Sequence, residues 1–242
     1  MLDRLLKLHE EHGWCVLEDA LPAPQRERLL GLTDCILESS DAGVRQAAGT
    51  VYAARNVIDV VPDIRGAWQN DLLVEFVQRR LGERAGLVRV LYFDKPPEQS
   101  WALPWHKDLL IAVDSLRETA GYSAPRLRAG VPHTEPPLEV LESMLTLRIH
   151  LDEVTPENGP LQVASGTHRT GKALVLDGFE RHSICTPAGS VLAMTPLLAH
   201  CSGRSTPGTM RHRRILHLEF SRLRELPGGM RWHRFEALAA ES

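Results

Sequence analysis

The N-terminal third of the chain places hydrophobic residues at helical spacing. Leucines follow this spacing in residues 1–12, and Gly13 breaks the pattern before the short apolar stretch 14–17. The proline-led segment 22–36 and residues 68–81 repeat the apolar stripe of an amphipathic helix. The region therefore predicts three helices, with one short buried strand after the first.

The rest of the chain is dominated by short apolar or alternating segments between glycine and proline turns, which is typical of strands. These segments are residues 87–93, 144–151, 161–163, 183–186, 190–195 and 213–220. Helices followed by a series of strands predict an α+β fold with a β-sandwich or barrel core and the N-terminal helices packed outside. A length of 242 residues fits one such domain, so we expect a single domain over residues 1–242.

Residues 144–151 alternate most clearly. Leucine and isoleucine occupy the odd positions, whereas Thr146 and Arg148 share the other face with Met144 and His150. If the apolar face packs against the outer helices, Thr146 and Arg148 line the barrel interior, where a ligand pocket is expected. The alternation is equally compatible with a polar face that is simply solvated.

Residues 112–140 are rich in glycine, proline, arginine and serine and show little regular pattern. A loop of this length inside a compact domain is usually a functional lid or is disordered. Because the segment directly follows a candidate metal-binding motif, we expect a lid loop over the site.

Composition narrows the classes of function. A formal charge of −3, with 43% hydrophobic and 24% charged residues, describes an ordinary globular protein without the basic footprint of a nucleic-acid or membrane-surface binder. The first residues lack the pattern of a signal peptide, and no apolar run is long enough to span a bilayer, so we expect a cytoplasmic protein. The four cysteines, which have no metal-site spacing, are expected to be buried free thiols: Cys15, Cys35, Cys185 and Cys201.

The candidate chemistry begins at Pro104-Trp105-His106-Lys107-Asp108. In an extended segment, His106 and Asp108 point to the same side and face one cavity. His200, at the end of another apolar run, is the most plausible third partner. Two imidazoles and one carboxylate form the facial triad that holds ferrous iron and leaves coordination positions open. His133 and His168 are weaker candidates because they lie beside proline or glycine turns.

The order of these motifs resembles the phytanoyl-CoA dioxygenase family, and the similarity extends from about Gly13 to Phe220. The blocks that carry it are His106-x-Asp108, then Glu157-Asn158-Gly159-Pro160-Leu161 with Gly166-Thr167-His168, then His200 and an arginine-bearing strand. The resemblance implies an iron(II)- and 2-oxoglutarate-dependent oxygenase on a double-stranded β-helix, or jelly roll. It also implies that His106, Asp108 and His200 are the metal ligands.

The resemblance further implies that an arginine on the strand after His200, together with Ser202, binds the distal carboxylate of 2-oxoglutarate. Counting forward from His200 points to Arg211, but counting backward from the strand that ends at Phe220 favours Arg213. We expect Arg213, because the intervening loop can absorb an insertion at little entropic cost. Thr146 is a further candidate for the cofactor site, and Lys95 receives no firm role.

The expected partners are a small-molecule substrate and O2, with neither nucleic acid nor membrane, and the oligomeric state is left open. Arg55 and Arg148 are candidates for the cavity, which favours a substrate with an anionic group. Related iron halogenases lack the carboxylate ligand, so the retained Asp108 favours hydroxylation, with oxidative decarboxylation of 2-oxoglutarate to succinate. Two alternatives are a cupin-like metal protein that binds a small molecule without redox turnover, and a zinc or manganese enzyme such as an isomerase. Ser202 and the trailing arginine favour the oxygenase.

Overall fold

The computed structural model describes residues 1–37, 44–47, 50–97 and 100–238. Its α-helices are α1 (Leu2–His12), α2 (Ala23–Leu37), α3 (Val57–Val60), α4 (Ile64–Ala67), α5 (Asp71–Leu81) and α6 (Leu138–Glu142). Short 3-10 turns are η1 (Pro156–Asn158), η2 (Thr167–Thr170) and η3 (Pro227–Gly229). The three longer helices, α1, α2 and α5, are those that the hydrophobic pattern predicts.

Helix ends follow local capping chemistry. Helix α1 stops at Gly13, which adopts the left-handed conformation (φ 82°) and donates its backbone N–H to the His9 carbonyl. Helix α5 begins at Asp71 and not at residue 68, because the Asn70 side chain accepts a hydrogen bond from the Leu73 backbone N–H at 3.0 Å.

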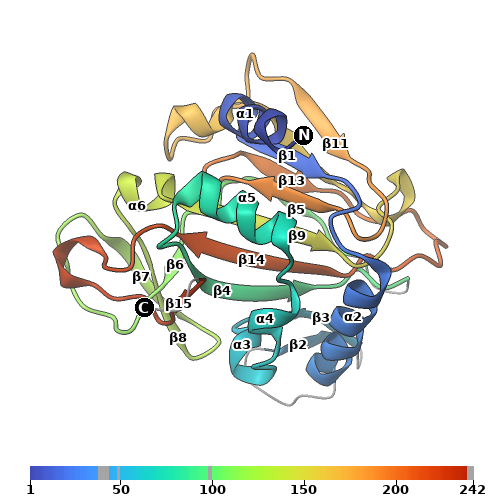
Figure 1. The fold of residues 1–242 in the computed structure, drawn as a ribbon, viewed down its shortest axis with the longest axis horizontal. Helices are drawn as coiled ribbons and strands as arrows, with labels where there is room; N and C mark the ends of the chain where they lie inside the picture. The colour runs from blue at the N-terminus through green and yellow to red at the C-terminus, as the bar shows by residue number, and fades with distance from the viewer. Residues whose placement is uncertain (38–43, 48–49, 98–99, 239–242) are drawn as a thin grey trace.

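Three antiparallel sheets make up the β-structure (Figure 1). The large sheet has the order β1 (Trp14–Leu17), β12 (Val191–Met194), β9 (Met144–His150), β14 (Ile215–Ser221), β4 (Gly86–Phe93), β3 (Thr50–Ala54) and β2 (Val44–Ala47), and β15 (Glu236–Ala237) also pairs with β4. The second sheet has the order β11 (Arg181–Ile184), β10 (Leu161–Ala164), β13 (His200–Ser202) and β5 (Leu103–His106). A small third sheet has the order β6 (Ile111–Ala112), β8 (Val131–Glu135) and β7 (Ser123–Arg128).

The outer face of the large sheet is apolar and packs against the helices. Helix α5 lies over β9 in Figure 1, and α2 lies beside β3. The alternating residues Leu145, Leu147 and Ile149 of β9 are fully buried in one cluster with side chains from α2 and α5. Burial of this face supplies the main hydrophobic core, as expected for a sheet covered by helices on one side.

The inner face of the large sheet meets the second sheet. At the β12 end the space between them is filled by apolar side chains, including Leu192 and Met194 opposite Leu161 and Val163. Toward β9, β14 and β4 the inner face carries polar and charged residues instead. Arg148 of β9 therefore faces the interior of the sandwich and not bulk solvent, which resolves the alternative left open by the sequence. The predicted α+β fold with a β-sandwich core is confirmed.

Residues 112–140 contain more regular structure than the sequence predicts. They include the β7–β8 hairpin, whose turn residues Ala129 and Gly130 have positive φ angles of 51° and 75°. The expectation of an irregular loop is therefore wrong. The strand pattern is hidden because β7 is a largely exposed edge strand that contains Pro125 and a bulge before Arg126. The role of this hairpin as a lid stays a prediction.

The four cysteines are free, as predicted, but only Cys15 is buried. Cys35 and Cys185 are exposed and Cys201 is half-buried. Apolar sequence neighbours predicted burial for Cys35, yet it lies on the solvent side of α2, because neighbouring helix positions point in different directions. None of the helices in the described part of the chain is long and apolar enough to cross a membrane.

Candidate iron and 2-oxoglutarate site

Two histidines from adjacent strands form the base of the site. His106 ends β5, and His200 begins β13 directly opposite it as its cross-strand partner. Facing positions of an antiparallel pair bring side chains close together, and the two ring centroids are 4.3 Å apart. Sheet pairing thus joins two motifs that are far apart in the sequence.

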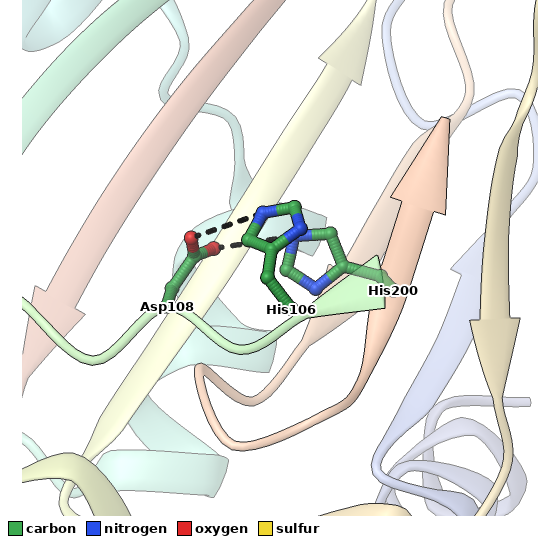
Figure 2. Close-up of side chains that lie close together, drawn as sticks. All are labelled: His106, Asp108 and His200. Carbon is green, nitrogen blue, oxygen red and sulfur yellow. Dashed lines mark ion pairs between the residues drawn. The ribbon is translucent and has the colours of Figure 1, made fainter. Parts of the chain in front are cut away.

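Asp108 completes the cluster from just beyond β5. The sequence predicted that Asp108 lies on the same extended segment as His106, but the strand ends at His106. The backbone N–H of Asp108 instead donates to the Pro196 carbonyl at 3.0 Å. Its carboxylate oxygens lie 3.9 Å from His106 Nε2 and 3.6 Å from His200 Nε2 (Figure 2). The three potential ligand atoms all lie within 4.8 Å of one another, close enough to share one metal ion.

Hydrogen bonds on the far side of each imidazole prepare the pair for a metal. His106 Nδ1 lies 2.7 Å from the Pro104 carbonyl oxygen, and His200 Nδ1 lies 2.9 Å from that of Leu198. A carbonyl only accepts, so each Nδ1 carries the proton and each Nε2 presents a lone pair toward Asp108. The donor set therefore fits a divalent metal such as iron(II).

The electrostatics favour the same protonation states. Burial would raise the pKa of Asp108, but the neighbouring imidazoles, His200 foremost, and Arg148 lower it to about 2. Burial lowers the pKa of His200 to about 4. At neutral pH the site thus contains an anionic carboxylate and a neutral imidazole, the forms that bind a metal.

The triad opens into a cavity of about 450 Å³ between the two main sheets and the β7–β8 hairpin. Arg55 and Arg148, both predicted from the sequence, line this cavity, and so do Ser202 and Arg213. Thr146 is not among the lining residues. It is buried on β9 beside Glu219 of β14, so its predicted part in cofactor binding gains no support from contact with the cavity.

Arg213 and Ser202 meet at one end of the cavity. Arg213 Nη1 donates to the Gly159 carbonyl at 2.6 Å, and Nη2 lies 3.5 Å from Ser202 Oγ. Arg213 precedes β14 by two residues, yet it exchanges both backbone hydrogen bonds with Lys95 at 3.2 Å, which extends the β4–β14 ladder. The expectation that Arg213 lies within the strand is corrected to this extension.

Lys95 joins the same group. Its side chain is fully buried and its Nζ donates to Ser202 Oγ at 2.6 Å and to the carbonyls of Gly159 and Gly203. The buried Arg213 guanidinium and the buried Lys95 amine therefore converge on one hydroxyl, with no carboxylate bonded to either among the described residues. A buried charge without a counter-ion is costly, so this end of the cavity is suited to an anion.

Arg211, the competing candidate, lies outside. It is half-exposed and pairs with Glu153 at 2.7 Å and with Glu157 at 3.6 Å. Alternation alone did not separate residues 211 and 213; the difference arises because the ladder with Lys95 begins only at Arg213.

The model of the phytanoyl-CoA dioxygenase family matches residues 9–213 of the 242. The chain belongs to the phytanoyl-CoA dioxygenase family. Its cofactors are iron(II) and 2-oxoglutarate, and it has the His-x-Asp and distal histidine of the family's metal triad.

Solved structures show the same double-stranded β-helix fold. EctD from S. alaskensis, in its apoform, superimposes with a TM-score of 0.71 at 18% identity, covering 97% of this chain and 83% of that one. SnoN, an α-ketoglutarate-dependent epimerase from nogalamycin biosynthesis, gives 0.66 at 15% identity, covering 91% and 80%. AviO1 from Streptomyces viridochromogenes Tue57 gives 0.63 at 17% identity, covering 91% and 95%. No curated protein sequence matches the chain.

The segment Glu157-Asn158-Gly159-Pro160-Leu161 of this phytanoyl-CoA dioxygenase family member has a structural role. The Asn158 side chain donates to the backbone carbonyls of Glu153 (2.8 Å) and His212 (3.1 Å), which ties the η1 turn to the residue before Arg213. Gly159 adopts φ 67°, and a Cβ there would lie 2.6 Å from the Gly203 carbonyl and 3.0 Å from Lys95 Nζ. Only glycine permits this close approach.

Sequence analysis missed several cavity residues. They are Arg89, Phe93, Trp101, Arg126, Arg128, His217 and Glu219. Most of these residues lie on β4, β14 and β7, where every second residue is on the cavity side. The extended pattern of residues 87–93 and 215–221 was visible in the sequence, but only the neighbours of a strand in the sheet show which of its two faces points inside.

Proposed function

We propose that the protein is an iron(II)- and 2-oxoglutarate-dependent hydroxylase of a small organic substrate. The observation that carries this proposal is that the His106, Asp108 and His200 cluster and the Arg213 and Ser202 pair line the same cavity. A cupin-like binding protein or a zinc or manganese enzyme needs only the metal cluster and does not require Arg213 and Ser202. The combination is what an enzyme that binds a metal and a dicarboxylate requires.

In this proposal, iron is held by the Nε2 atoms of His106 and His200 and by the carboxylate of Asp108. When bound there, iron would supply oxygen activation coupled to the oxidative decarboxylation of 2-oxoglutarate to succinate. The protein positions the ligands: the Pro104 and Leu198 carbonyls fix the two rings, so little reorganisation is needed when the metal binds. Retention of Asp108 as a ligand favours hydroxylation over halogenation.

The distal carboxylate of 2-oxoglutarate is assigned to Arg213, Ser202 and Lys95. A planar guanidinium offers parallel donors that match a carboxylate, and the Ser202 hydroxyl adds a third. The Lys95 amine, 2.6 Å from Ser202 Oγ, is a further donor that would take up a proton when the carboxylate binds. Since this end of the cavity is buried, the ion pairs form away from water and are correspondingly strong.

The remaining volume is assigned to the substrate. Phe93, Trp101 and Leu161 give the cavity an apolar wall that excludes water from the reacting carbon. The β7–β8 hairpin contributes Arg126, and we propose it as the lid that covers the bound substrate.

The test is turnover by purified protein. With iron(II), 2-oxoglutarate and oxygen, the wild type should form succinate, and His200→Ala should form none while retaining the folded state by circular dichroism. His12→Ala, which removes an exposed imidazole at the end of α1, is the matched control and should behave like wild type. Products formed in chloride buffer should gain oxygen and not chlorine.

Succinate formation that survives His200→Ala would remove the proposed metal site. Tight iron and 2-oxoglutarate binding with no succinate, with or without candidate substrates, would instead favour the cupin-like binding protein.

A further inference from the structure

The cavity wall is strongly basic. Six of its lining residues are arginines and three are aspartate or glutamate, whereas the amine of a seventh basic residue, Lys107, is bonded to Thr167, Thr170 and Gly171. The three carboxylates already have partners: Asp108 belongs to the metal triad, Glu135 lies 3.0 Å from Lys172, and Glu219 lies 3.5 Å from Arg89. Within the described part of the cavity, no carboxylate is left as the counter-ion of Arg148.

Arg148 is the buried member of this excess. It lies on the inner face of β9 with 6% of its surface exposed, and its guanidinium lies 5.9 Å from the Phe93 ring centre. Nη1 contacts His217 Nδ1 at 2.9 Å, and Nε has no hydrogen-bond partner among the described residues. Although burial lowers its pKa to about 10, Arg148 remains charged at neutral pH.

The contact with His217 does not neutralise Arg148. An arginine side chain has only donors, so His217 Nδ1 must accept and its proton must be on Nε2, which faces Glu219 Oε1 at 3.4 Å. This tautomer is neutral. The charge of Glu219 is shared with Arg89, so the chain of four groups from Arg89 to Arg148 keeps one net positive charge, located beside the cavity.

Arg148 is separate from the proposed 2-oxoglutarate anchor. It lies on β9, whereas Arg213 and Lys95 extend the β14 and β4 ladder. Among the described residues Arg148 makes no hydrogen bond to Arg213, Lys95 or Ser202, although its charge lowers the pKa of both Arg213 and Lys95. The cavity therefore has two cationic positions. Asp108 is the carboxylate whose charge acts on Arg148. When Asp108 binds iron, its charge is balanced by the metal, so the counter-ion of Arg148 must come from a ligand.

Resting on the proposed function, we propose that Arg148 binds an anionic group of the primary substrate, which is thereby a small organic acid. A carboxylate or a phosphate satisfies the free edge of the guanidinium with charge-assisted hydrogen bonds. The apolar side chains of the cavity wall, among them Phe93 and Leu91, predict that the rest of the substrate is hydrocarbon in character. Arg148 is on this account a specificity-determining residue.

The experiment uses the anaerobic iron(II)·2-oxoglutarate complex of the full chain. Formation of its metal-to-ligand absorption band tests the proposed function alone. A panel of small aliphatic and aromatic carboxylic acids and phosphate monoesters, each with a matched neutral amide or alcohol, is then added, and the concentration that shifts the band is measured for each pair.

Acids should shift the wild-type band at concentrations at least about tenfold lower than their neutral partners, since one charge-assisted pair is equivalent to 1.4 kcal/mol or more. Arg148→Met should abolish this preference and leave half-saturation by 2-oxoglutarate within about threefold. Arg148→Lys should keep part of the preference, and Arg211→Met, which removes an exposed arginine, should keep all of it.

Equal responses to acids and neutral partners, including no response to either, would overturn the inference while the band itself stands. A preference that survives Arg148→Met would also overturn it. A rise of tenfold or more in the 2-oxoglutarate requirement of Arg148→Met would assign the residue to the co-substrate instead.

Discussion

The two faces of strand β9 have opposite tasks. On the outer face, Leu145, Leu147 and Ile149 are fully buried against helices. On the inner face, one residue along, Arg148 is also buried, but beside the cavity and in contact with His217. Residues that stabilise the core and a residue that lines the cavity are thus neighbours along the strand, because alternate side chains point to opposite sides of a sheet.

The two faces are stabilised by different interactions. The outer face gains free energy from each apolar group removed from water. The inner face holds arginine, histidine and glutamate, which are stable there only when paired with one another or with a ligand. Substitutions on the two faces should therefore fail in different ways.

The largest expected effect on stability lies on the outer face. Leu147→Ala should lower the free energy of unfolding by roughly 2–5 kcal/mol, because it leaves a cavity in a close-packed core. Chemical denaturation measures this loss, and Leu127→Ala, at a site 63% exposed on β7, should cost less than about 0.5 kcal/mol. At low temperature Leu147→Ala should still bind iron(II) like wild type. Loss of iron binding with little loss of stability would contradict the claim that the outer face of β9 affects stability and not the metal site.

A smaller effect is expected at Lys107, which lies between two metal ligands but points away from the metal. Its Nζ donates to the carbonyls of Thr167 (2.8 Å) and Gly171 (2.7 Å) and to Thr170 Oγ1 (2.9 Å). Lys107→Met removes all three of these bonds, although the Thr167 carbonyl still accepts from Thr170 Oγ1, and should cost about 1–3 kcal/mol. It should also weaken iron(II) binding, because the β5 segment loses its anchor to η2.

Lys172→Met removes a lysine from the half-exposed pair with Glu135 and should cost less than about 1 kcal/mol. Equal losses in the two lysine variants, or unchanged iron affinity in Lys107→Met, would show that the anchor does not position the ligands.

The smallest expected effect is a pH dependence. Burial, together with the positive charges of Arg213 and Arg148, lowers the pKa of Lys95 to about 6. Because the folded-state pKa is below the unfolded one, the contribution of Lys95 to stability rises as pH increases from about 6 toward the ordinary lysine value near 10.4. A bound carboxylate favours the protonated form of the Lys95 amine. Binding of 2-oxoglutarate at pH 8 should therefore be accompanied by proton uptake at Lys95, and the affinity for 2-oxoglutarate should fall as pH rises.

Calorimetry in buffers of different ionisation enthalpy measures this proton uptake. The uptake should approach one proton in the wild type and disappear in Lys95→Met. Proton release on binding, or uptake that persists without Lys95, would be inconsistent with contact between the amine and the co-substrate.

Much of this arrangement was accessible from the sequence because it depends on local periodicity. The alternation in residues 144–151 placed Leu147 and Arg148 on opposite faces, and the apolar run before His200 identified it as a partner of His106 and Asp108. The β7–β8 hairpin was missed because an exposed edge strand with a proline lacks the apolar half of the pattern. The inward position of Arg89, His217 and Glu219 depends on long-range strand pairing, which no local pattern contains.

The choice between Arg213 and Arg211 shows the same limit. Both have the same parity, and the loop before them has no fixed length, so spacing along the chain cannot decide. The structure pairs Arg213 with Lys95 through the backbone and leaves Arg211 at the surface with Glu153. The role of Arg213 in binding 2-oxoglutarate remains a prediction.

The most direct measurement is an anaerobic titration of 2-oxoglutarate into the iron(II)-loaded protein, followed by the metal-to-ligand absorption band, for wild type, Arg213→Met and Arg211→Met. Loss of a buried charge-assisted pair costs on the order of 2–5 kcal/mol, so Arg213→Met should raise the half-saturating concentration at least about tenfold. Arg211→Met should leave it within about twofold, since an exposed ion pair contributes little. The reverse ranking, or a wild-type protein that shows no band, would contradict the proposal that one cavity binds both iron, through His106, Asp108 and His200, and 2-oxoglutarate, through Arg213.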